Sequence, residues 1–98
     1  MVKMIAITEK AFEYQVKDLA KLFGWQYYHP FLSKWSERGF PDVTLLRPPR
    51  LIFAELKSDK GRLLPAQAHW LWELRKVPCA EVYIWRPRHI ERIAEILR

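Results

Sequence analysis

Three ionisable residues, Asp42, Glu55 and Lys57, have the types and the spacing to act together in a reaction. Glu55 and Lys57 stand two residues apart at the end of the apolar run Leu51–Leu56, and side chains two apart on a strand point to the same face. A second apolar run, Val43–Leu46, directly follows Asp42. A hairpin of the two runs would therefore bring Asp42 beside Glu55.

Two carboxylates and one ammonium suit metal-assisted cleavage of a phosphodiester. Carboxylate oxygens are typical ligands of Mg²⁺, which fills its other positions with water and phosphate oxygens. A bound metal lowers the pKa of a coordinated water and neutralises charge on the phosphorus centre. Lys57 can orient or deprotonate that water, or stabilise the developing charge. A solvated ion pair at the end of a surface strand is the alternative, because Glu-x-Lys alone is a common pattern.

The elements that position these residues follow from the apolar spacing and from the helix and strand breakers. Apolar residues between Thr8 and Gly24 recur on one helix face, with Thr8 as the N-cap and Gly24 as the stop. The link Arg47–Arg50 is too short for a crossover, so the runs beside it should pair antiparallel. The other expected elements are a strand at Trp25–His29, a helix from Pro65 to about Lys76, a strand at Val82–Trp85 and a helix at Arg88–Leu97. The expected fold class is α/β: a mixed sheet with flanking helices in the order α-β-β-β-α-β-α.

The composition bounds the possible functions. With 98 residues, half of them hydrophobic and 14% aromatic, residues 1–98 should form one folded domain. The 17 basic and 11 acidic residues give a net charge of +6, which favours a polyanionic partner such as nucleic acid. The single cysteine, Cys79, excludes an internal disulfide framework and a thiolate-rich zinc site. Without an apolar run of roughly 20 residues, we expect no membrane span and a cytoplasmic protein.

A family resemblance rests on four motifs in this order: Gly39-Phe40-Pro41-Asp42, Glu55-Leu56-Lys57, Gly61-Arg62-Leu63 and Gln67. Together they resemble the VRR-NUC domain, the virus-type replication-repair nuclease of the PD-(D/E)xK superfamily, over nearly the whole chain. The resemblance implies a restriction-endonuclease-like fold and a Mg²⁺- or Mn²⁺-dependent DNA endonuclease that leaves 5′-phosphate and 3′-hydroxyl ends. Branched DNA, such as a Holliday junction, is the expected substrate of a phage- or prokaryote-type intracellular protein. No small-molecule cofactor is expected, and paired cuts would require a homodimer.

The resemblance also implies roles for individual residues. Asp42 and Glu55 match the metal ligands, the backbone carbonyl of Leu56 matches a further ligand, and Lys57 matches the catalytic lysine. Gln67 matches a family glutamine that would orient Lys57, a water or a phosphate. An ordinary polar residue at a helix N-terminus is the alternative for Gln67.

The family also has an acid on its first helix, and both Glu9 and Glu13 qualify. At about 100° per residue, Glu9 lies nearer the core-facing edge of the apolar stripe. The resemblance aligns Glu9 with the leading glutamate, so we expect Glu9 at the site and Glu13 in support through a water or the metal. In the alternative, Glu9 only favours the helix dipole and Glu13 only pairs with Lys17.

Basic residues near these motifs are expected to meet DNA phosphates, with solvated loop charges as the alternative. They are Lys34, Arg38, Lys60 and Arg62. His29 is expected to be a polar residue at a strand end, or else to contact a phosphate. Rival hypotheses for the whole chain are a non-catalytic nucleic-acid-binding module on the same fold and a nuclease that acts on flaps or linear DNA.

Overall fold

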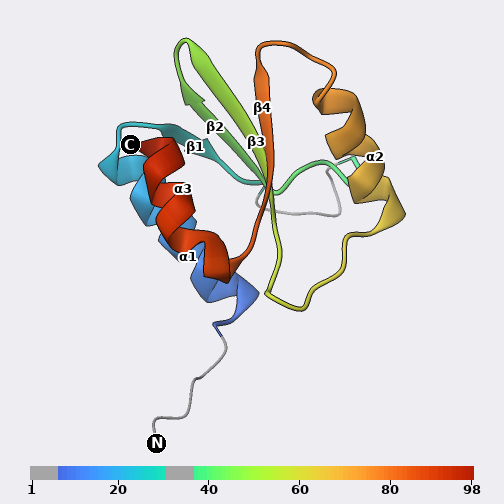
Figure 1. Ribbon diagram of the computed structural model, residues 1–98, viewed down its shortest axis with the longest axis horizontal. Coiled ribbons are helices and arrows are strands. Elements are labelled where there is room, and N and C mark those ends of the chain that lie inside the picture. The colour runs from blue at the N-terminus through green and yellow to red at the C-terminus, as the bar shows by residue number, and fades with distance from the viewer. Residues whose placement is uncertain (1–6, 31–36) are drawn as a thin grey trace, which may run out of the picture.

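The computed structural model describes residues 7–30 and 37–98, and its helices and strands follow the expected order (Figure 1). The elements are α1 (Glu9–Leu22), β1 (Gln26–Tyr28), β2 (Val43–Arg47), β3 (Arg50–Leu56), α2 (Pro65–Leu74), β4 (Ala80–Trp85), the 3₁₀ turn η2 (Pro87–His89) and α3 (Ile90–Leu97). α2 ends before the expected Lys76, because the chain tightens there and the Lys76 amide donates to the Glu73 carbonyl. None of the helices in the described ranges is long and apolar enough to cross a membrane.

The four strands form one mixed sheet in the order β1-β2-β3-β4. β1 and β2 are antiparallel, as are β2 and β3, whereas β3 and β4 are parallel. α2 lies in the crossover that the parallel pair requires. In the β2–β3 hairpin, Arg47 pairs with Arg50 beside the turn, and Val43 pairs with Ala54 near the open end. The expected hairpin and fold class are confirmed.

The hydrophobic core lies between one face of the sheet and the helices α1 and α3, which run side by side (Figure 1). Its buried members are Phe12, Val16, Ala20, Trp25, Val43, Leu45, Ile52, Ala54, Leu56, Trp85, Ile93 and Leu97. Alternate residues of β2 and β3 face this core, so the residues between them face the other side of the sheet. On that side the Phe40 ring contacts the rings of Phe53 and Trp70, 6.0 and 5.1 Å away between centroids.

α1 begins and ends where the sequence predicts. The Thr8 hydroxyl accepts a hydrogen bond from the Ala11 amide at 3.1 Å, and Gly24 adopts a φ of 81° just beyond the helix. The cap places Glu9 in the first turn. α1 therefore presents its acidic N-terminal turn at a fixed position relative to the core.

The turn end of the hairpin is tied to the C-termini of two helices. The Arg47 guanidinium donates to the carbonyls of Phe23 (2.8 Å) and Leu97 (3.0 Å). The Trp25 indole also donates to the Leu97 carbonyl at 2.8 Å. Cations at the C-termini of helices complement the exposed carbonyls. These bonds fix the hairpin at the end opposite Asp42.

Candidate active site

Asp42 and Glu55 meet at the open end of the β2–β3 hairpin. The pairing of Val43 with Ala54, continued by one residue, places Asp42 opposite Glu55. One carboxylate oxygen of Asp42, Oδ2, accepts a hydrogen bond from the Leu56 amide at 2.9 Å. The structure thus brings together the two carboxylates that the sequence singled out.

The Glu55 carboxyl is buried and lacks a compensating partner. Its side chain is 1% exposed, and neither carboxylate oxygen has a hydrogen-bond donor in the described part of the chain. Burial, reinforced by the neighbouring Asp42 carboxyl and by Glu9, raises the pKa of Glu55 to about 9, while Lys57 acts in the opposite direction. Two ionised carboxylates cannot bond to each other, so a shared proton or a cation must join them.

Lys57 directly follows β3 and is held by the parallel neighbour, because its amide donates to the Trp85 carbonyl at 3.0 Å. Its charge acts on Glu55, as expected for two side chains on one face. Leu56, between them, is buried in the core on the opposite face. The side chains of β3 therefore keep alternating between the two faces of the sheet as far as Lys57.

Arg86 fixes the loop that follows Lys57. Its guanidinium donates to the carbonyls of Ser58 at 2.6 Å and Gly61 at 2.7 Å. Sequence reasoning did not single out Arg86. Its position in the sequence could have indicated this role. Arg86 directly follows β4, which runs parallel to β3, and parallel strands end at the same edge of a sheet.

The two acids on α1 differ in their surroundings. Glu9 is exposed in the first turn of α1, and its charge adds to the effect of burial and of Asp42 in raising the pKa of Glu55. Glu13 Oε1 lies 3.3 Å from Nε2 of His29, and Nδ1 of His29 lies 2.7 Å from the Asp42 carbonyl oxygen. Glu13 thus pairs with His29 and, among the described residues, not with Lys17, which corrects that alternative. The participation of Glu9 and Glu13 in catalysis stays a prediction.

Gln67 caps α2. Its side-chain oxygen accepts a hydrogen bond from the Leu64 amide at 2.9 Å, which corresponds to the structural alternative considered from the sequence. A role toward Lys57 stays a prediction. Gly39 packs on the same first turn, where a Cβ atom would lie 2.5 Å from the Ala66 carbonyl carbon, so only glycine fits.

Three of the expected DNA contacts, Arg38, Lys60 and Arg62, have exposed side chains. Lys34, the fourth, lies outside the described residues. The Arg38 carbonyl accepts a hydrogen bond from the Trp70 indole at 3.0 Å, which ties its backbone to α2. These cations are available to solvent, and their contact with DNA stays a prediction.

The donor set of the site fits a hard divalent cation. In residues 7–30 and 37–98, no three His, Cys, Asp or Glu side chains are grouped to hold a metal by themselves. Asp42 and Glu55 supply a pair, and Mg²⁺ commonly takes one or two carboxylates and keeps several waters or phosphate oxygens. The unpartnered oxygens of Glu55 are the feature that such an ion would satisfy.

Two solved structures are similar to the chain in fold. One, named VRR_NUC domain, superposes with a TM-score of 0.72 at 17% identity, covering 89% of this chain and 94% of its own. The other, named VRR_NUC domain protein, has a TM-score of 0.64 at 16% identity, covering 95% and 87%. No protein-family model and no curated protein matches the sequence. The chain therefore has the fold of VRR-NUC domains, as the motifs implied.

Proposed function

We propose that the chain is a Mg²⁺- or Mn²⁺-dependent DNA endonuclease of the VRR-NUC family, with residues 1–98 as its nuclease domain. The observation that carries this proposal is Glu55, a buried carboxyl with unpartnered oxygens beside Asp42 and within the influence of Lys57. A buried acid of this kind costs stability unless a proton or a cation compensates it. The similarity in fold to VRR-NUC domains and the net charge of +6 also support a nuclease that acts on DNA.

The proposed roles follow the geometry. A bound divalent cation would supply a water of lowered pKa and charge neutralisation at the phosphate. Asp42, Glu55 and the Leu56 carbonyl would hold that cation, and the Leu56 amide orients Asp42. Lys57 would orient the attacking water, accept its proton or stabilise charge on the phosphate. Glu9, supported by Glu13 through a water or the metal, would add a further carboxylate to the site. In-line attack would leave a 5′-phosphate and a 3′-hydroxyl.

Branched DNA, with the Holliday junction as the leading case, is the proposed substrate, and flapped or linear DNA is the alternative. One site cuts one strand, so paired cuts across a junction require two copies, which we propose as a homodimer. Sedimentation of the protein at micromolar concentration, alone and with DNA, tests the assembly. A monomer under both conditions would contradict it. A cytoplasmic location stays a prediction.

A cleavage panel tests the function. The protein is incubated with linear, flapped and four-way DNA, in Mg²⁺, in Mn²⁺ and in chelator. We expect cutting only with metal, and fastest on branched DNA. Binding without cutting in every condition would favour the rival, a non-catalytic nucleic-acid-binding module on this fold.

A further inference from the structure

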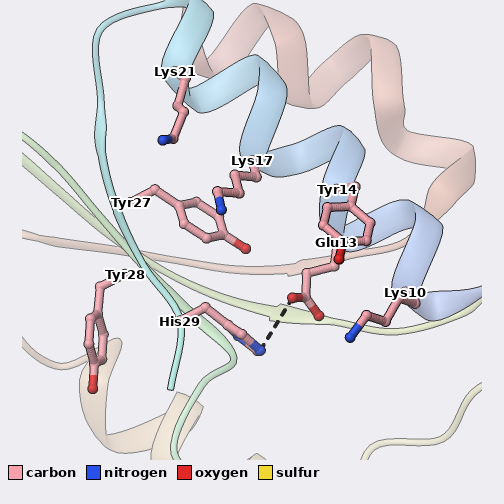
Figure 2. Close-up of a pocket in the computed structure, with 8 residues that line it drawn as sticks. All are labelled: Lys10, Glu13, Tyr14, Lys17, Lys21, Tyr27, Tyr28 and His29. Carbon is pink, nitrogen blue, oxygen red and sulfur yellow. Dashed lines mark ion pairs between the residues drawn. The ribbon is translucent and has the colours of Figure 1, made fainter. Parts of the chain in front are cut away.

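A cavity of about 500 Å³ lies between α1 and β1 (Figure 2). Its lining residues are Lys10, Glu13, Tyr14, Lys17, Lys21, Tyr27, Tyr28 and His29. Three lysines stand against one glutamate, and that glutamate is already paired with His29. The cavity therefore favours an anion.

The lysines form a line along one face of α1. Lys17 and Lys21 follow Lys10 by seven and eleven residues, which at about 100° per residue returns each to within about 20° of Lys10. At about 1.5 Å per residue the line is roughly 16 Å long, enough for several phosphates of one strand. None of the three forms an ion pair within the described residues. Such a row suits a linear polyanion better than a single phosphate.

Two exposed tyrosines belong to the lining of the cavity, and the Tyr28 ring points away from α1 (Figure 2). Tyr14 on α1 is 55% exposed and Tyr28 on β1 is 62% exposed, which is high for large aromatic side chains. Exposed aromatic rings beside a positive groove are typical of surfaces that bind single-stranded nucleic acid, because unpaired bases can stack on them. Bases within a duplex do not offer their faces in this way.

The cavity and the candidate active site share a wall. His29 contacts Glu13 in the cavity with one ring nitrogen and lies 2.7 Å from the Asp42 carbonyl oxygen with the other. Burial, followed by the charges of Glu13 and Asp42, raises the pKa of Tyr27, whose side chain lines the cavity. His29 therefore stands between the cavity and the backbone of Asp42.

We propose that this cavity binds a single-stranded segment of the substrate next to the scissile phosphate. Lys10, Lys17 and Lys21 contact successive phosphates, and Tyr14 and Tyr28 stack on bases. This inference rests on the proposed function for its DNA substrate, and its test below is a binding measurement that requires no cleavage.

The test compares two DNAs in chelator by fluorescence anisotropy: a blunt duplex, and the same duplex with a single-stranded arm of about 10 nucleotides. We expect the protein to bind the armed DNA more tightly. The triple variant Lys10→Gln/Lys17→Gln/Lys21→Gln should bind the armed DNA on the order of tenfold more weakly and keep its affinity for the blunt duplex. Its slope of log affinity against log salt on the armed DNA should fall by about 2.

The matched control removes three charges elsewhere, at Arg75, Lys76 and Arg92, whose side chains are exposed. The control variant should keep the preference for the armed DNA. A second variant, Tyr28→Ala, should weaken only armed binding, by roughly fivefold or more. Circular dichroism checks that each variant folds.

Four results would overturn the inference. They are equal binding of the two DNAs by the unmodified protein, equal losses on both DNAs in the lysine variant, loss of the preference in the control variant, and no effect of Tyr28→Ala combined with displacement of the arm by inorganic phosphate. The fourth result would identify a site that binds phosphate alone and makes no contact with the bases of a strand. If the protein binds the arm as expected but cuts nothing with metal, the proposed nuclease function fails and this binding site stands.

Discussion

Oδ2 of Asp42 accepts a hydrogen bond from the backbone amide of Leu56, on the neighbouring strand, at 2.9 Å. The sheet itself thus holds one oxygen of this carboxylate. The same strand places Glu55 on the site and Leu56 in the core. Leu56, which packs in the core, therefore orients Asp42 through its amide and is the chain neighbour of Glu55. This ties the geometry of the site to the stability of the fold.

Replacing Asp42 or Lys57 by alanine should abolish cleavage without abolishing DNA binding. Each variant removes a charge that acts on the reacting groups, so we expect cutting to fall about 100-fold or more. Single-turnover cleavage and anisotropy binding measure the two properties separately. Arg92→Ala, which loses an exposed cation paired with Glu95, is the control and should cut normally. Normal cutting by either site variant would refute its assigned role.

Without metal, the free energy of unfolding should fall as pH rises from about 4.5 to about 9. Glu55 keeps its proton in the folded state until about pH 9, whereas in the unfolded chain it loses the proton near its ordinary pKa of 4.5. The folded state then binds more protons across this window, so stability is greatest below it and is lost through it. Thermal denaturation in chelator measures the effect. Glu55→Gln should remove most of the slope, and an unchanged slope would contradict the burial of an uncompensated acid.

Mg²⁺ should raise the thermal midpoint of the protein at slightly alkaline pH. A cation that binds the folded state alone stabilises it by mass action, and it also compensates the ionised Glu55. Glu55→Gln should show little or no shift with Mg²⁺. An equal shift in both proteins would place the metal elsewhere.

Arg86→Gln should slow cleavage and leave DNA binding near normal. The substitution removes the hydrogen bonds that hold the Ser58 and Gly61 carbonyls, so the loop after Lys57 loses its fixed position. We expect kcat to fall about tenfold with KM little changed, because a small displacement of a catalytic group is costly. Hydrogen exchange of the 58–61 amides should rise in parallel. Slower cleavage with unchanged exchange would refute the positioning role.

Arg47→Met should destabilise the fold by about 2 kcal/mol without changing the cutting rate of the folded protein. The variant leaves the carbonyls of Phe23 and Leu97 without their guanidinium donor. Denaturant titration measures the loss, with Arg92→Met as an exposed control. If Arg47→Met slows cutting as much as Arg86→Gln does, the contacts at the turn end of the hairpin also affect the site at its open end, which would contradict this prediction.

Local patterns were enough to predict much of the fold. The Thr8 cap and the apolar stripe define α1, and the short Arg47–Arg50 link forces an antiparallel hairpin. The approach of Asp42 to Glu55 follows from that hairpin, because register and side-chain alternation need no knowledge of distant segments. Differences at the ends of α2 and α3 are small adjustments of helix termini.

The rest depends on contacts between distant segments. Burial of Glu55 to 1% requires the surrounding sheet and helices, and the bonds of Arg86 require β4 to lie parallel to β3. Glu13 has Lys17 one helical turn away, yet it pairs with His29 on β1's flank, which only the packing of α1 reveals. Gln67 is a different case. Its hydrogen bond with the Leu64 amide is local, whereas the family motif predicts a role toward Lys57, a water or a phosphate.

Single-turnover cleavage of a branched DNA by the protein and by Glu55→Gln, in Mg²⁺ and in chelator, tests whether Asp42 and Glu55 form a metal-dependent nuclease site. The protein should cut only in Mg²⁺, and Glu55→Gln should cut on the order of 100-fold more slowly or not at all while it binds the DNA as tightly. Cutting that continues in chelator, or a Glu55→Gln rate equal to that of the unmodified protein, would contradict a metal-dependent nuclease centred on Asp42 and Glu55.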